Sequence, residues 1–286
     1  MSNSPGTSSI LRILRNTGRR FGYRGGGRRK GGFEGNYDNW ESASSAALRI
    51  GAGYDQPCIL DVVEKSTMAV IEGKAAFERD SVLFNYPDYP YPVLACLLKL
   101  AAEKRGRLSV LDFGGALGSL YFQCKPFLNR LESLRWNVVE QSHFVMKGNA
   151  SFQTSELRFF PTITDCLSSE RPDVAIFSGV LQYLESPNTC IDEVGATGAA
   201  LLIDRTPTVS ESADAYTIQN VPASIYRATL PFRAFGRESL SRMKPPGYVS
   251  TADFDALDGN VMLGGREIRF KGFFLEKSKA NELRKH

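Results

Sequence analysis

The chain has 286 residues, a net charge of +4 and 42% hydrophobic residues, which suits one α/β domain with additions. No apolar run is long enough to cross a membrane and no signal-peptide core is present, so we expect a soluble, cytoplasmic protein. Five cysteines are scattered without a C-x-x-C pair, which argues against a disulfide framework and against a zinc site.

The positive charge is concentrated at the N-terminus, where residues 1–30 carry eight Lys and Arg and no acid. Subtracting these eight charges from +4 leaves residues 31–286 at −4. We expect residues 1–32 to form a disordered tail rich in Gly, Arg and Ser. Residues 10–30 have the chemistry for weak contact with RNA, DNA or an anionic membrane, but a transit peptide and a functionless extension fit equally well.

Residues 33–105 are expected to form an N-terminal helical cap. Asp38 or Asn39 suits the N-cap of a helix that ends at Ile50, and a second helix is expected over 57–77. Prolines then interrupt regular structure, in a segment rich in aromatic residues that precedes a third helix. This aromatic segment is either a flap over a neighbouring site or a packed corner.

A strand, a glycine-rich turn and a helix follow, and the other elements are organised around them. An apolar run, 108–111, leads into Asp112, and the helix is expected over 119–131. Glycines in such a turn let a ligand approach the backbone, and the free N–H groups of a helix start favour negative charge. The glycines are Gly114, Gly115 and Gly118.

The next strand, 136–140, ends in an acid. Glu140 lies twenty-two residues after Gly118, about the separation at which a βαβ nucleotide site places the acid that binds ribose hydroxyls. The alternative is a solvated first-turn residue favoured by the helix dipole. An acid ahead of the glycines would repel a pyrophosphate, whereas S-adenosylmethionine has no phosphate and carries a sulfonium and an amino group. The turn therefore favours S-adenosylmethionine over a dinucleotide.

With this turn the chain resembles the class I S-adenosylmethionine-dependent methyltransferases. More narrowly, segments 111–122, 177–183 and 203–207 are similar to a family of bacterial methyltransferases often encoded near polysaccharide-biosynthesis genes. The resemblance covers residues 33–277. It implies a Rossmann-like α/β fold with a mostly parallel seven-stranded sheet, helices on both faces and S-adenosylmethionine as cofactor.

Three further strands are expected at 157–160, 172–177 and 199–203, and the carboxyl ends of parallel strands collect at one edge of the sheet. The resemblance implies that Ser178 and Gly179 line the methionine end of the cofactor. The expected cofactor-binding residues are Asp112, Gly114, Gly115, Gly118, Glu140, Gln141, Ser178 and Gly179.

The methyltransferase core is expected over residues 106–277, with an insertion over 207–246 that caps the acceptor site. The insertion is rich in Tyr, Phe and Arg without clean periodicity. The strand that begins at 247 and the strand over 266–276 correspond to the reversed hairpin that closes such a sheet. Residues 278–286 are expected to be a frayed tail.

Methyl transfer from a sulfonium is an in-line displacement, so the protein mainly has to position the acceptor, and no metal is required. His143 is expected on the surface of a helix. Asp204 either faces the acceptor or forms a salt-bridged strut with Arg205. The candidates for a catalytic base are Asp204, Tyr183, Tyr226 and Glu185.

The chain lacks an Asn/Asp-Pro-Pro-Tyr segment after its fourth strand, which argues against methylation of nucleic-acid bases. We expect O-methylation of a small molecule or saccharide by in-line methyl transfer. Two alternatives are a nicotinamide-dependent oxidoreductase and a non-catalytic nucleotide-fold protein recruited to RNA or membrane by its basic arm.

Overall fold

The computed structural model describes residues 32–51, 53–54, 57–263 and 265–278. The predictions for most of the basic tail and for residues 279–286 lie outside this part. None of the helices in the described ranges is long and apolar enough to cross a membrane.

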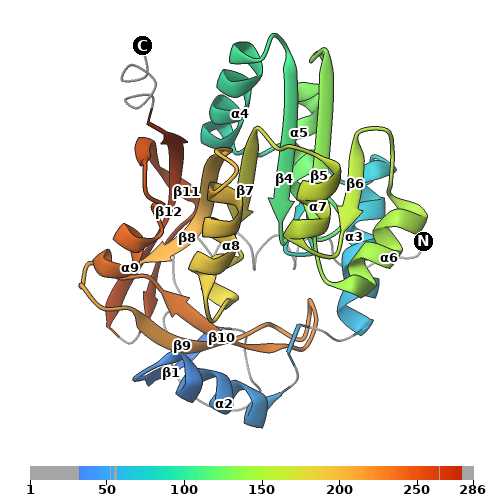
Figure 1. Cartoon of the computed structure of the whole chain (residues 1–286). Helices are drawn as coiled ribbons and strands as arrows, with labels where there is room; N and C mark the ends of the chain where they lie inside the picture. Colours follow the sequence, from blue (N-terminus) through green and yellow to red (C-terminus); the bar gives the residue numbers. More distant parts are fainter. Residues whose placement is uncertain (1–31, 52, 55–56, 264, 279–286) are drawn as a thin grey trace, which may run out of the picture.

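A seven-stranded sheet forms the centre of the molecule (Figure 1). Its last strand, β12, is antiparallel to both of its neighbours, while β8, β7, β4, β5 and β6 are mutually parallel. This is the strand order of the class I methyltransferase fold, as expected. In spatial order the strands are β11 (Tyr248–Leu263), β12 (Arg266–Lys277), β8 (Ala200–Thr208), β7 (Val174–Ser178), β4 (Arg107–Phe113), β5 (Ser133–Val139) and β6 (Leu157–Phe160).

Helices cover both faces of this sheet, because alternate residues of each buried strand point to opposite sides. In β7, Val174 and Ile176 pack into one hydrophobic cluster, and Ala175 and Phe177 pack into the other. The first cluster includes residues of α3 (Pro57–Ile71), α4 (Tyr91–Glu103), α5 (Ser119–Leu128) and α6 (Ser142–Ser151). The second includes residues of α7 (Ile163–Ser169), α8 (Pro187–Gly195) and α9 (Arg237–Arg242), together with the short helix η1 (Leu181–Tyr183).

A second, three-stranded sheet lies toward the carboxyl ends of the parallel strands (Figure 1). It joins β1 (Gly32–Tyr37) from the N-terminal region with β9 (Ala215–Asn220) and β10 (Thr229–Ala234) from the insertion. Helix α2 (Trp40–Ile50) packs on this sheet through Ala46 and Ala47, which cluster with Ile218 of β9. The Asn39 side chain caps α2, as predicted.

The N-terminal region is less helical than expected. Besides α2, α3 and α4 it contains β1 and a hairpin of β2 (Phe77–Arg79) and β3 (Val82–Phe84). The predicted helix over 57–77 is therefore too long, because α3 ends at Ile71 and Phe77 belongs to β2. The insertion is also more regular than expected, since pairing with β1 organises two strands there.

Candidate functional site

The glycine-rich turn between β4 and α5 has the backbone that glycine permits. Gly114 and Gly118 have φ angles of 74° and 94°, and Gly118 is the N-cap of α5. The Gly114 N–H donates a hydrogen bond to the Val139 carbonyl at 2.9 Å, which fixes the turn beside the end of β5. A Cβ on Gly114 would lie 2.7 Å from Val180 Cγ2, so the turn is also packed closely against the segment after β7.

Asp112 supports this turn from within the core. Its side chain is 2% exposed, and its Oδ2 accepts a hydrogen bond from Trp136 Nε1 at 2.9 Å. A Cβ on Gly115 would lie 2.5 Å from that same oxygen, so only glycine fits over the carboxylate. Burial raises the pKa of Asp112 to about 6.

Glu140 directly follows β5 and lies against the turn. Its Oε2 accepts a hydrogen bond from the Gln141 N–H at 2.6 Å, and the backbone of Ala116 also stabilises the carboxylate. Burial outweighs these contacts and raises the pKa of Glu140 to about 7. Gln141 is the exposed N-cap of α6. The acid and the glycine turn, identified separately in the sequence, are thus neighbours in space.

Ser178 and Gly179 lie at the carboxyl end of β7, next to β8. The Ser178 Oγ donates to Asp204 Oδ2 at 3.0 Å, and the Gly179 N–H donates to the Asp204 carbonyl at the same distance. Asp204 is 5% exposed, and burial raises the pKa of its carboxyl group. The sequence placed Asp204 in a loop after its strand, which is wrong, because β8 continues to Thr208.

Arg205 forms salt bridges, but with Asp80 and Asp258 and not with the predicted partner, Asp204. Its φ angle of 52° lies in the left-handed region. Its Nη2 lies 2.7 Å from Asp80 Oδ2, and its Nε lies 2.9 Å from Asp258 Oδ2. Arg205 therefore joins the β2–β3 hairpin to β8 and β11.

The two candidate tyrosines are both partly buried. The Tyr183 hydroxyl donates to Gln219 Oε1 in β9, and its ring contacts Phe232. Tyr226 lies edge-on to Tyr54, with ring centroids 6.2 Å apart. Burial raises the pKa of both tyrosines, so both remain protonated at neutral pH.

The structure places Glu185, the remaining candidate base, and His143 in different surroundings. The Glu185 side chain is exposed, and its backbone carbonyl accepts a hydrogen bond from Arg233. His143 is not the exposed helix residue that we expected. It is partly buried against Phe144, and its Nε2 is buried without a hydrogen-bond partner in the described ranges.

The structure adds residues to the site that the sequence analysis did not identify. Tyr54 stacks on Phe144 of α6, with ring centroids 5.8 Å apart. Burial raises the pKa of Tyr54 most, followed by the nearby charges of Tyr226, Glu140, Asp80 and Glu78. Tyr54 thus faces both Glu140 and the acids of the β2–β3 hairpin. No local sequence motif marks Tyr54 as a site residue, because it comes from a segment that is distant from the glycine turn in the sequence.

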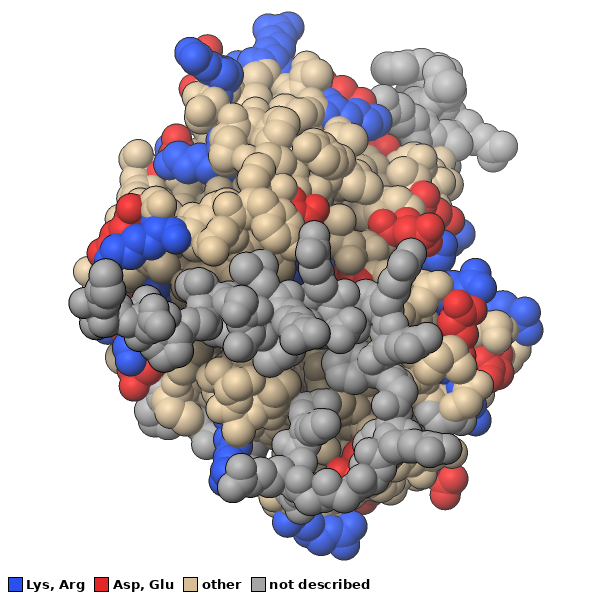
Figure 2. Space-filling model, turned by 180° about the vertical axis from the view of Figure 1, so that it is seen from behind, with Lys and Arg blue, Asp and Glu red and all other residues tan. Residues whose placement is uncertain are grey.

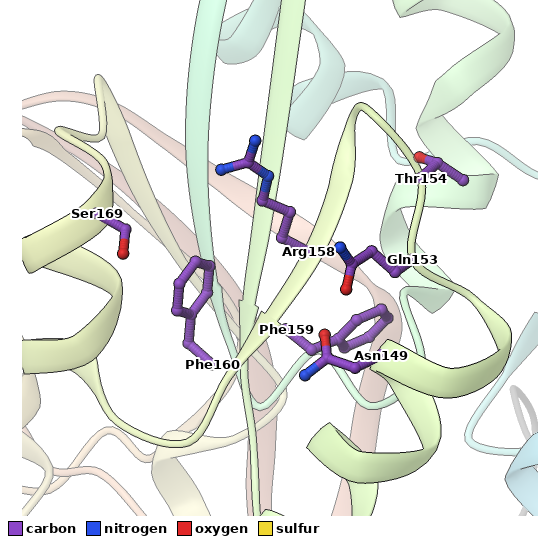
Figure 3. A pocket seen from close by; sticks show the side chains of 7 residues that line it. All are labelled: Asn149, Gln153, Thr154, Arg158, Phe159, Phe160 and Ser169. Atoms are coloured by element: carbon purple, nitrogen blue, oxygen red, sulfur yellow. The ribbon is translucent and has the colours of Figure 1, made fainter.

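A cavity of about 300 Å³ lies elsewhere, at the outer edge of β6 beside α6 and α7 (Figure 3). None of its lining residues is a predicted site residue. They are Asn149, Gln153, Thr154, Arg158, Phe159, Phe160 and Ser169. Within the described ranges, no three His, Cys, Asp or Glu side chains are placed to hold a metal ion.

Comparison with known proteins gives similarity in fold only. No family model matches the chain, and no curated protein matches it. A methyltransferase from Methanosarcina mazei is 12% identical, with a TM-score of 0.46, over 67% of this chain and 99% of that one. An S-adenosylmethionine-dependent methyltransferase from Clostridium acetobutylicum is 12% identical, with a TM-score of 0.43, over 67% and 92% of the two chains.

A third structure is magnesium protoporphyrin IX methyltransferase from Synechocystis with bound S-adenosylmethionine. It is 13% identical, with a TM-score of 0.40, over 66% of this chain and 79% of that one. Because these sequence identities and TM-scores are low, the assignment of the fold rests on the strand order of the sheet in Figure 1.

Proposed function

We propose that the chain is an S-adenosylmethionine-dependent methyltransferase that acts on a hydroxyl oxygen of a small molecule or saccharide. The observation that carries this proposal is the contact between Glu140 and the glycine turn that Asp112 supports. Such a pair binds a nucleoside, with ribose hydroxyls donating to the acid and the 5′ substituent lying at the start of the following helix.

The charges around this pair favour a cationic ligand. Arg205 is paired with Asp80 and Asp258, and Arg79 is paired with Asp88. The carboxylates of Asp112 and Glu140 accept hydrogen bonds from uncharged donors. A pyrophosphate would be repelled by them, whereas a sulfonium and an ammonium group would be attracted. The carboxylates at the site are those of Glu78, Asp80, Asp112, Glu140, Asp204 and Asp258.

When bound, S-adenosylmethionine supplies an electrophilic methyl group, so the residues of this chain bind, orient and handle the acceptor proton. Glu140 accepts hydrogen bonds from the ribose, and the backbone at Ser178 and Gly179 lines the methionine end. Asp204 is the candidate base, since its raised pKa brings a carboxylate closer to the pKa that proton abstraction needs. The Tyr226 hydroxyl can donate a hydrogen bond to a hydroxyl group of an acceptor, whereas the Tyr183 hydroxyl, which already donates to Gln219, can accept one.

The surface seen in Figure 2 does not favour the nucleic-acid alternative. On that face, Lys and Arg of the described residues alternate with Asp and Glu and form no continuous basic area. Phosphate-driven binding needs clustered cations.

Isothermal titration calorimetry of the full chain tests the proposal with S-adenosylmethionine, S-adenosylhomocysteine and NAD as ligands. We expect both adenosyl ligands to bind and NAD not to bind. Binding of NAD alone would support the oxidoreductase alternative. Binding of none of the three, with RNA affinity that falls on removing residues 1–30, would support a non-catalytic role.

The role of Asp204 needs a separate variant. Asp204→Asn keeps an oxygen that can accept from Ser178, so we expect its fold and its affinity for S-adenosylhomocysteine to match those of the wild type. Turnover should fall about 10²- to 10⁴-fold, because a base is lost. Turnover equal to that of the wild type would return Asp204 to a structural role.

A further inference from the structure

Glu78 points inward from the β2–β3 hairpin. Side chains alternate along a strand, and its neighbours Phe77 and Arg79 lie together on the other face. The Phe77 ring stacks on Phe84 at 4.5 Å, and the Arg79 guanidinium group lies over both rings. Glu78 is 5% exposed, so its carboxylate is buried on the face of the hairpin toward α5.

One oxygen of this carboxylate is left without a partner. Glu78 Oε2 accepts a hydrogen bond from the Ser81 N–H at 2.9 Å. Glu78 Oε1 is buried and has no hydrogen-bond partner among the described residues. A buried carboxylate oxygen without a hydrogen-bond partner lowers the stability of the folded state, and natural proteins rarely retain one without a role.

The turn of the hairpin holds Glu78 in this arrangement. Asp80 and Ser81 have φ angles of 50° and 65°, a left-handed conformation that is unfavourable for residues other than glycine. The turn aims the Ser81 N–H at Glu78 and the Asp80 carboxylate at Arg205. Because Arg205 is held by Asp80 and Asp258, it does not serve as the counter-ion of Glu78 Oε1.

Glu78 lies where the 5′ substituent of a bound nucleoside is expected. Burial raises the pKa of Glu78, and the Ser119 hydroxyl, at the first position of α5 after the glycine turn, opposes this rise. Strand β2 packs against α5, so Glu78 lies on the side of the hairpin that faces the helix after the glycine turn. With the ribose at Glu140, the group attached to its 5′ carbon extends toward the start of α5.

We propose that Glu78 Oε1 accepts a hydrogen bond from the α-ammonium group of the methionine moiety of the cofactor. This inference rests on the proposed function, because it takes S-adenosylmethionine as the ligand. An ammonium group has three donors and a full positive charge, which satisfies a buried carboxylate oxygen. The free N–H groups in the first turn of α5 remain available to the α-carboxylate of the same moiety. Glu78 thereby selects an amino-acid substituent over a phosphate.

Calorimetry with two ligands and three proteins tests this pairing. The ligands are S-adenosylhomocysteine and its analogue that lacks the α-amino group. The proteins are the full-length wild type, Glu78→Gln and the control Glu72→Gln, which alters an exposed acid beside the hairpin. We expect Glu78→Gln to weaken S-adenosylhomocysteine by about ten- to a hundredfold, because a charge-assisted hydrogen bond is lost. The analogue should bind Glu78→Gln and the wild type within about twofold, since it has no group to lose.

The outcomes separate the inference from the proposal beneath it. If Glu78→Gln weakens both ligands equally, or neither, the pairing with the ammonium group is wrong while the cofactor assignment stands. If the wild type binds neither ligand, the cofactor assignment fails and the inference fails with it. A second measurement on the wild type does not depend on folding of the variant. As the pH falls, affinity for S-adenosylhomocysteine should decrease more than affinity for the analogue, because protonation of Glu78 removes the acceptor charge; parallel decreases would contradict the pairing.

Discussion

The site has two sides that are built differently, which we call the floor and the roof. The floor consists of the glycine turn and the carboxyl ends of β4, β5, β7 and β8. The roof consists of β1, β9, β10, α2 and the β2–β3 hairpin. The floor has large apolar clusters on both faces of its sheet, whereas the roof has a small core and polar links to the floor. The floor therefore holds Asp112 and Asp204 in a large apolar core, and the hairpin of the roof contributes Glu78.

The largest expected effect compares a buried phenylalanine from each side. Phe177 in β7 is fully buried, and Phe232 in β10 is 1% exposed. Truncation of either to alanine should lower the free energy of unfolding by about 3–5 kcal/mol. Phe232 packs in a cluster with Ile268 and Phe270 of β12, so we expect both variants to unfold in a single transition. Chemical denaturation followed by fluorescence and circular dichroism measures this, and a separate early transition in Phe232→Ala would show that the roof unfolds independently.

Gly115→Ala should have the next largest effect, and it acts on the floor alone. The added Cβ meets Asp112 Oδ2, which cannot move because it is buried and hydrogen-bonded to Trp136. We expect a loss of about 1–3 kcal/mol in stability and weaker binding of S-adenosylhomocysteine. Gly247→Ala is the control, because its Cβ meets nothing within 4 Å and it lies just before β11, at the end of that strand that pairs with Lys277. Its φ angle of 81° should lower stability by about 1–2 kcal/mol without changing ligand affinity. Unchanged ligand affinity in Gly115→Ala would mean that the turn does not shape the binding site.

Glu140→Gln tests the floor through its dependence on pH. Burial raises the pKa of Glu140 from 4.5 to about 7, so the folded state binds more protons than the unfolded state between these values. The contribution of Glu140 to wild-type stability consequently falls as the pH rises from 4.5 to 7 and is level above that. At pH 8 the variant should be more stable than the wild type by about 1–3 kcal/mol, with the difference vanishing at pH 4.

The same variant should bind the cofactor less well. Ribose hydroxyls donate to the carboxylate, so affinity of the wild type for S-adenosylhomocysteine should rise with pH up to about 7, whereas that of Glu140→Gln should lack this component. Thermal denaturation and calorimetry from pH 4 to pH 8 give both difference curves. If the affinities of the two proteins for S-adenosylhomocysteine depended equally on pH, Glu140 would not contact the ligand.

The smallest effect is expected where an ion pair joins the roof to the floor. Asp80 pairs with Arg205, but its side chain is 65% exposed, so Asp80→Asn should cost about 0–1 kcal/mol. Hydrogen exchange in residues 77–84 should nevertheless become faster, because the hairpin loses its link to β8. Asp255→Asn, which breaks an exposed pair with Lys271 away from the hairpin, should leave that exchange unchanged. Slow exchange in Asp80→Asn would mean that packing alone holds the hairpin.

The floor was largely predictable from the sequence because its information is local. The strands β4, β5 and β7 are apolar runs, and the strand β6 begins and ends where predicted. Glycines at Gly114 and Gly118 mark a turn with left-handed backbone, and the spacing to Glu140 follows from one βαβ unit. The contact of Glu140 with the turn was therefore accessible without a structure.

The roof could not be predicted, because it depends on pairing between distant segments. Gly32 pairs with Asn220, and the Thr217 hydroxyl donates to the carbonyl oxygens of Glu34 and Gly35. Neither partner shows a clear alternation of polar and apolar residues by itself. Glu78 was missed for the same reason, since its strand has three residues and its function depends on where the hairpin docks. The strand before Asp204 was expected to end at residue 203, whereas β8 continues past the left-handed Arg205 to Thr208.

A crystal structure grown with S-adenosylhomocysteine tests the central claim most directly. The account predicts that the ribose hydroxyls contact the Glu140 carboxylate, that the amino-acid end lies at the start of α5, and that no ligand atom enters the cavity at the edge of β6. Density for the ligand away from the glycine turn, or a diphosphate bound between the turn and Glu140, would contradict it.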